Sequence, residues 1–188
     1  MQYVTGDTIY EIRIHGRGGQ GVKTTAHILG RAAFLAGYET QDFAIYGAER
    51  RGAPVASFCR MDKTRILTRG YIFNPDAVIV LDPTISREAV LGGTTKETLI
   101  VVNSERPVSK FMGAFFVDAT KIALDTLGKP IPNVAILGCF LKKTRLFSLD
   151  KLKEAVRTEL EEAGHPEHVK GNIEACERCW SGVRRESH

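Results

Sequence analysis

The stretch RIHGRGGQGVKTT, residues 13–25, joins an apolar run to a helical pattern and contains four glycines. Three of them, Gly16, Gly18 and Gly21, have the G-x-G-x-x-G spacing of a dinucleotide-binding turn. A tight strand-to-helix turn often needs positive φ, and phosphate reaches backbone N–H groups only where no Cβ intervenes. The spacing therefore predicts a strand–turn–helix unit with an anion site at the carboxyl end of its strand.

Three kinds of ligand compete for this turn, and the sequence leaves more than one of them open. A P-loop would place lysine directly after the last glycine, but Val22 separates Gly21 from Lys23. A dinucleotide site also needs an acidic residue about 20 positions further on, and Asp42 stands at a suitable place. The turn could also bind another phosphate-bearing ligand, pack a helix on a strand, or contact another subunit.

Strand-like and helical patterns alternate along the chain. Strand-like runs lie at residues 9–15, 38–43, 54–60, 64–68, 77–81, 98–102 and 114–117. Helical patterns lie at residues 22–36, 119–127, 133–143, 149–163 and 166–180. This order predicts an α/β fold: an open, mostly parallel twisted sheet with helices on both faces and a helical C-terminal part. Residues 9–43 read as a βαβ start, and the runs at 54–60 and 64–68 as a small antiparallel hairpin or addition.

Length and composition place limits on the class of protein. The 188 residues predict one domain spanning 1–188, with residues 1–8 and 181–188 as frayed tails. The net charge of +4 is too small to indicate nucleic-acid binding. No apolar run approaches the roughly 18 residues of a membrane span, and the N-terminus lacks the pattern of a secretory signal. The four cysteines lack the density of a disulfide scaffold, which favours the cytoplasm.

Other residues that could carry chemistry are interpreted as structural. Cys176 and Cys179 form one C-x-x-C pair within a helical pattern, and one pair does not complete a four-ligand site. His165 and His168 could in principle add two ligands, but their order and spacing are not those of a zinc finger. We therefore expect no metal site and no catalytic residue in this chain.

Longer segments of the chain resemble one known family. In order, they are IRIHGRGGQGVKTTAHILGRAA, YGAERRGAPVASFCRMD, PDAVIVLDPT, VDATKIALDTLGKPIPNVAILGCF and NIEACERCW. Together they resemble the gamma subunit, or gamma domain, of 2-oxoacid:acceptor oxidoreductases, such as pyruvate:ferredoxin and ketoisovalerate oxidoreductases. The resemblance covers nearly the whole chain, and the two loops HGRGGQG and GAERRGAPV are specific as a pair.

The resemblance implies a heteromeric enzyme that converts a 2-oxoacid, CoA and an oxidised acceptor into acyl-CoA, carbon dioxide and reduced acceptor. Thiamine diphosphate would lie between alpha-type and beta-type subunits, and [4Fe-4S] clusters on delta-type and often beta-type subunits. The acceptor would be ferredoxin or a flavin- or NAD-linked subunit. The gamma unit would bind no cofactor alone but would shape the active-site wall and contact CoA. The 2-oxoacid stays open: pyruvate, 2-oxoglutarate, branched-chain or aryl.

The same resemblance implies which residues contact the cosubstrate. The expected cofactor-binding set is Gly16, Gly18, Gly19, Gln20, Gly21, Arg50, Arg51 and Gly52. Arg50 and Arg51 supply adjacent guanidiniums, which suit bidentate phosphate contact, although one could instead pair with Glu49 or with a partner subunit. Two alternatives stay open: a free-standing NAD(P)- or FAD-binding domain, and an assembly subunit whose glycine loop packs against a partner.

Overall fold

A computed structural model of the chain describes residues 9–45, 52–182 and 184–185. The strands are β1 (Tyr10–Arg17), β2 (Glu39–Ala44), β3 (Pro54–Asp62), β4 (Ala77–Val80), β5 (Leu99–Asn103), β6 (Phe115–Val117) and β7 (Arg184–Arg185). The α-helices are α1 (Val22–Leu35), α2 (Arg87–Leu91), α3 (Ala119–Leu127), α4 (Ala135–Thr144), α5 (Leu149–Glu162) and α6 (Val169–Ser181). Two short 3-10 turns, η1 (Ser109–Phe111) and η2 (Pro166–His168), complete the described elements.

The strands form one sheet in the order β2-β3-β1-β4-β5-β6-β7. Its centre, β1, β4, β5 and β6, is parallel. The apolar sequences of β4 and β5 are those expected of parallel strands that are buried on both faces. The β1–α1–β2 unit is present, but β3 lies between β1 and β2 and pairs antiparallel with both. The antiparallel addition is therefore built from β2 and β3. The prediction of a strand at residues 64–68 was wrong, because that segment has no strand structure.

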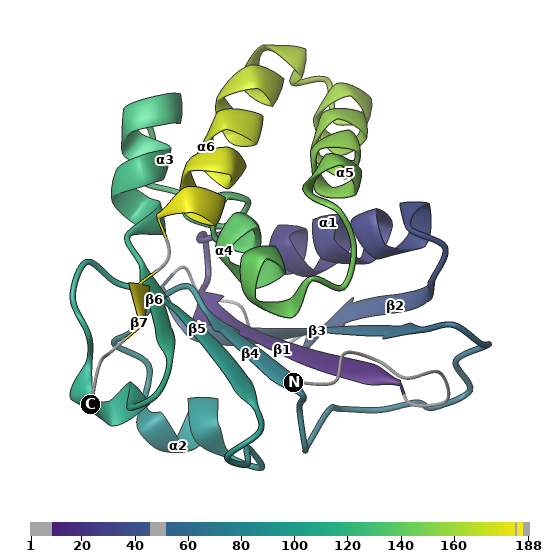
Figure 1. The fold of residues 1–188 in the computed structure, drawn as a ribbon, viewed down its shortest axis with the longest axis vertical. Coiled ribbons are helices and arrows are strands. Elements are labelled where there is room, and N and C mark those ends of the chain that lie inside the picture. The colour runs from purple at the N-terminus through teal and green to yellow at the C-terminus, as the bar shows by residue number, and fades with distance from the viewer. Residues whose placement is uncertain (1–8, 46–51, 183, 186–188) are drawn as a thin grey trace.

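Helices cover both faces of the sheet, as predicted, but unequally. Figure 1 shows α1, α4, α5, α6 and α3 on one face and the short α2 on the other. The larger core on the first face joins Ile12, Ile14 and Ile79 of the sheet to Ile28 and Phe140 of the helices, all 0% exposed. A smaller core on the second face packs alternate residues of the central strands against α2 and η1. The central strands are thus buried on both sides.

The C-terminal helical part agrees with the pattern read from the sequence. Asp118 starts α3 by accepting a hydrogen bond from the backbone N–H of Lys121 at 2.9 Å. Helix α4 approaches α6 so closely that a Cβ at Gly138 would collide with the carbonyl oxygen of Cys176. After α6, Arg184–Arg185 pair with β6, so this part of the expected frayed tail is paired. Residues 1–8, 183 and 186–188 lie outside the described residues.

Candidate anion-binding site at the glycine loop

The glycine loop follows β1 and precedes α1, at the carboxyl edge of the parallel strands. It is hydrogen-bonded to the end of the second predicted loop, at Gly52 and Ala53. The N–H of Gly18 donates to the carbonyl of Ala53 at 2.9 Å, and the N–H of Gly52 donates to the carbonyl of Gly18 at 3.1 Å. The structure therefore brings the two predicted loops together. Arg50 and Arg51 lie outside the described residues.

Gln20, predicted to contact a ligand, supports the loop from within. Its Oε1 accepts a hydrogen bond from the N–H of Arg17 at 2.8 Å, and its Nε2 donates to Asp82 Oδ2 at 3.1 Å. Gly16 lies beneath this amide, where an added Cβ would meet Gln20 Oε1 at 3.1 Å and Val22 Cγ2 at 2.6 Å. Gln20 and Gly16 therefore determine the shape of the turn, and the hydrogen-bonding groups of the Gln20 amide are already used within the protein.

Arg17 ties the loop to two other segments, a role that the sequence did not reveal. Its Nε donates to Asp82 Oδ2 at 3.1 Å, its Nη2 to Thr84 Oγ1 at 2.8 Å, and its Nη1 to the carbonyl of Gly52 at 3.0 Å. The only sequence signal was an arginine between two glycines of the turn. The guanidinium of Arg17 is thus engaged in hydrogen bonds that hold the site together.

Asp82, at the end of β4, receives the hydrogen bonds of this network. Burial alone would raise the pKa of its carboxyl group, but bonds from Thr84 and Gln20 and the charge of Arg17 together lower it. Thr84 donates its N–H and its hydroxyl to Asp82 Oδ1 at 2.8 and 2.6 Å. A charged carboxylate therefore fixes the loop from behind.

The first turn of α1 starts at a residue that has no side chain to cap it. Gly21 begins the helix at φ 74° and makes no side-chain cap bond to the leading N–H groups. A Cβ at Gly21 would collide with the side chain of Asn133, which lies just before α4. Free N–H groups and the positive end of the helix dipole form a general anion site.

A cavity of about 250 Å³ opens at this helix end. It is lined by Arg17, Gly18, Gly19, Gly21, Val22, Lys23, Ala44, Ile45, Val55, Ala56 and Ser57. Ser57 on β3 is only 1% exposed, and its Oγ has no hydrogen-bond partner among the described residues. A buried hydroxyl is normally hydrogen-bonded, so this one is consistent with a ligand oxygen placed in the cavity.

The geometry disfavours a dinucleotide at this loop. Asp42, the residue expected to meet a ribose, lies on β2, and β3 separates β2 from β1. Its Oδ2 lies 3.2 Å from Nδ1 of His27, which is a residue of α1.

His15, near the end of β1, is 7% exposed, and burial together with the charge of Arg13 lowers its pKa to about 4. It is therefore a neutral, buried packing residue near pH 7.

Comparison with known proteins gives the affiliation of the chain. The family model for pyruvate ferredoxin/flavodoxin oxidoreductase matches residues 11–181. The chain belongs to this oxidoreductase family. A relative from Pyrococcus furiosus, the pyruvate/ketoisovalerate oxidoreductases common subunit gamma, is 43% identical over 156 residues, covering 78% of this chain and 84% of the relative. Pyruvate synthase subunit PorC of Methanocaldococcus jannaschii is 44% identical over 148 residues, covering 78% and 83%.

Solved structures of the family share the fold. Pyruvate oxidoreductase subunit PORC of Thermotoga maritima superposes with a TM-score of 0.83 at 30% identity, covering 96% of this chain and all of the other (100%). A 2-oxoglutarate:ferredoxin oxidoreductase of Magnetococcus marinus, solved with 2-oxoglutarate, coenzyme A and succinyl-CoA, gives 0.73 at 19% identity, covering 93% and 31%. The family resemblance read from the sequence is confirmed, as is the α/β fold class.

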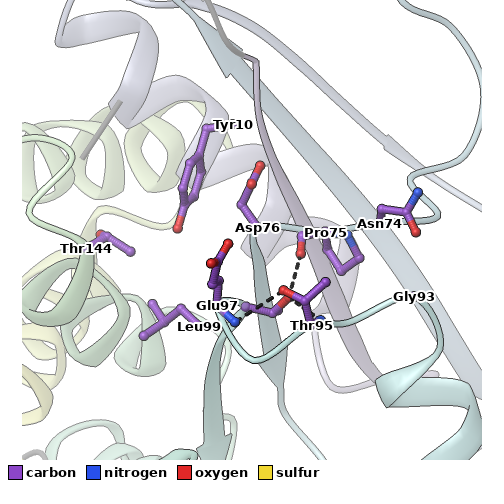
Figure 2. A pocket seen from close by; sticks show the side chains of 10 residues that line it. Tyr10, Asn74, Pro75, Asp76, Gly93, Thr95, Glu97, Leu99 and Thr144 are labelled. Atoms are coloured by element: carbon purple, nitrogen blue, oxygen red, sulfur yellow. Dashed lines mark hydrogen bonds between the residues drawn. The ribbon is translucent and has the colours of Figure 1, made fainter. Parts of the chain in front are cut away.

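A second, larger cavity of this chain, about 630 Å³, lies at the opposite edge of the sheet, where the parallel strands begin. Figure 2 shows Tyr10, Asp76, Thr95 and Glu97 around it. Burial raises the pKa of the Asp76 carboxyl, although the N–H of Glu11 donates to it at 2.7 Å. Two carboxyl groups suit hydroxyl or amine ligands rather than phosphate, so this cavity is chemically distinct from the glycine loop.

The cysteines and histidines near the C-terminus do not come together. Cys176 and Cys179 are fully buried in the core, and burial raises both thiol pKa values, that of Cys176 to about 12. His165 and His168 instead flank Glu167 at the surface, each with one ring nitrogen 3.5 Å from its Oε1. A joint Cys₂His₂ set is therefore not formed.

Within the described part of the chain, no helix is long and apolar enough to span a membrane.

Proposed function

We propose that this chain is the gamma subunit of a multi-subunit 2-oxoacid oxidoreductase and that its glycine loop contacts the phosphates of CoA. Partner subunits of alpha, beta and delta type would hold thiamine diphosphate and the [4Fe-4S] clusters. Thiamine diphosphate, when bound there, supplies the decarboxylation chemistry. This chain would add a wall of the active site and a phosphate contact, with ferredoxin or a flavin- or NAD-linked subunit as acceptor.

The observation that carries the proposal is the cavity at the start of α1. Three features meet there: the uncapped helix N-terminus, the lysine side chain of Lys23, and the buried Ser57 hydroxyl. Each suits a phosphate oxygen, through N–H donors, positive charge and a hydroxyl donor respectively. Lys23 supplies the charge without the planar geometry of arginine.

The predicted arginines would extend the same site. Arg50 and Arg51 precede Gly52, whose N–H and carbonyl both bond to residues of the glycine loop. The two arginines lie one and two positions before Gly52 in the sequence, and this proximity is the reason for including them in the proposed site. All four cysteines are buried as free thiols, which supports a reducing compartment, and we place the complex in the cytoplasm.

The subunit proposal is tested by native purification of the tagged chain, followed by mass spectrometry and by thiamine and iron assays. Larger subunits carrying thiamine diphosphate and iron–sulfur clusters are expected to co-purify. A panel of 2-oxoacids, tested on that complex with CoA and ferredoxin, then identifies the substrate. A chain that purifies alone, and binds nicotinamide or flavin instead, contradicts the proposal.

The CoA contact is tested by reversing the charges of the two loop arginines in the assembled complex. Arg50→Glu with Arg51→Glu should leave the complex intact and raise the KM for CoA about tenfold or more, because charge-assisted hydrogen bonds are lost. A matched double reversal at the exposed Lys96 and Arg106 should change neither property. If the loop is only an assembly contact, the complex dissociates and any surviving complex keeps its KM for CoA.

A further inference from the structure

Residues 63–76 connect β3 to β4 and contain neither helix nor strand, and residues 63–74 of this connection are here called the arm. In Figure 1 it is the loop that leaves the end of β3 and returns to the start of β4. Loops of about this length inside compact domains are uncommon and are usually functional or disordered. The contacts of the arm show which of these two descriptions applies.

The sheet holds the arm in place at several points. Arg60, itself 1% exposed, donates from Nη2 to the carbonyl of Gly70 at 2.9 Å. Arg13 donates from Nη1 to the carbonyl of Phe73 at 3.2 Å. Ile72 between them is 2% exposed. Two buried guanidiniums and one buried aliphatic side chain therefore fix the backbone of the arm.

The anchored arm directs large apolar side chains into solvent. Leu67 is 73% exposed, Phe73 is 71% exposed and Tyr71 is 52% exposed. The ring of Tyr71 also stacks on Phe58 of β3 at 5.7 Å between centroids, which fixes its position. Single exposed apolar residues are ordinary, but three within seven residues of a held backbone are typical of an interaction surface.

The charge of the arm restricts the partner. The arm carries Lys63, Arg65 and Arg69 and no acidic residue, while Asp76, two positions after it, accepts a hydrogen bond from the N–H of Glu11 at 2.7 Å. Lys63 lies over the ring of Tyr38 at 3.3 Å, whereas Arg65 and Arg69 have no side-chain partner among the described residues. A two-fold contact between two copies of the arm would place these like charges together, so a second copy of the chain is disfavoured. An acidic partner surface is favoured.

We propose that the arm docks this chain onto an acidic face of a larger subunit of the same oxidoreductase. Leu67 and Phe73 would enter apolar pockets, and Arg65 and Arg69 would pair with carboxylates around them. The inference rests on the proposed function, since it takes its partner from the complex, but it uses residues remote from the glycine loop. Because the sheet already orders the arm, little conformational entropy would be lost when it binds.

The test measures the affinity of the purified chain for the complex that lacks it. Leu67→Ser with Phe73→Ser should weaken binding about 30-fold or more, the effect expected for loss of an interface hot spot. Arg65→Glu with Arg69→Glu should weaken it similarly and reduce its dependence on salt. Matched controls are Met112→Ser with Leu124→Ser, and Lys96→Glu with Arg106→Glu, all at exposed positions outside the arm. Both arm variants should keep the wild-type melting temperature.

The outcomes separate the two proposals. If the wild-type complex forms and both arm variants bind as tightly as wild type, the docking inference is overturned while the subunit proposal stands. It is also overturned if the control variants weaken binding as strongly, or if the arm substitutions abolish only a dimer of this chain. If the wild-type chain assembles with no larger subunit, both proposals fail. Protection of residues 63–74 from hydrogen exchange on assembly supports docking directly.

Discussion

The amide of Gln20 joins the glycine loop to the end of β4, because its Nε2 donates to Asp82 Oδ2 at 3.1 Å. The same side chain accepts the N–H of Arg17 through Oε1 at 2.8 Å. One glutamine thus satisfies a backbone donor of the loop and a partly buried carboxylate behind it. The loop is a supported structure rather than a flexible tether, which suits a site that must hold a ligand in a fixed place.

Replacing Gln20 by glutamate tests this support. Gln20→Glu keeps the size but sets a carboxylate against Asp82, so we expect the free energy of unfolding at pH 7 to fall by about 2 kcal/mol. Gln41→Glu is the matched control. Gln41 Oε1 accepts a hydrogen bond from Arg60 Nη1 at 3.0 Å, so a carboxylate at this position would lie beside a positive charge. Urea denaturation measures both variants. Equal stability of the two would contradict the assigned role of Gln20.

The sequence predicted the elements that follow from local pattern. The apolar runs ending at Asp82 and Asp118 became β4 and β6 with their following turns, and α3 has the bounds expected for it. The insertion of β3 between β1 and β2 was not predictable. The periodicity of apolar residues identifies a strand, but which strands it pairs with depends on residues that are distant in sequence. Arg17, Thr84 and Ser57 were missed for the same reason: their roles come from neighbours remote in sequence.

Buried His15 makes stability depend on pH. Its pKa is lowered from 6.5 to about 4 by burial and by Arg13, so the unfolded chain binds a proton that the folded chain excludes. Between these values stability rises with pH; it is lost as pH falls below 6.5, by about 3 kcal/mol once pH reaches 4. His15→Gln should remove this component from the measured pH profile of unfolding. An unchanged profile would show that His15 titrates normally.

Gly21 combines a left-handed backbone with close packing. Gly21→Ala would strain φ 74° and drive Cβ into Asn133, so we expect a loss of about 3 kcal/mol or more, of which backbone strain accounts for about 1–2 kcal/mol. Gly164→Ala is the matched control, since Gly164 has φ 77° but open space around it, and should lose only the strain. Adding Asn133→Ala to Gly21→Ala should recover the difference. Thermal unfolding of the four chains measures each contribution.

The buried hydroxyl of Ser57 links the stability of the chain to its proposed ligand. The hydroxyl has no hydrogen-bond partner among the described residues, so Ser57→Ala should stabilise the isolated chain by about 1 kcal/mol.

In the assembled oxidoreductase the same change should raise the KM for CoA about tenfold and leave kcat unchanged, because a hydrogen bond to a phosphate is lost. Ser109→Ala, at an exposed position, should alter neither quantity. A stabilised chain with unchanged KM would mean that the Ser57 hydroxyl does not meet CoA. The proposed phosphate contacts would then be the backbone N–H groups of the glycine loop, Lys23, and Arg50 and Arg51.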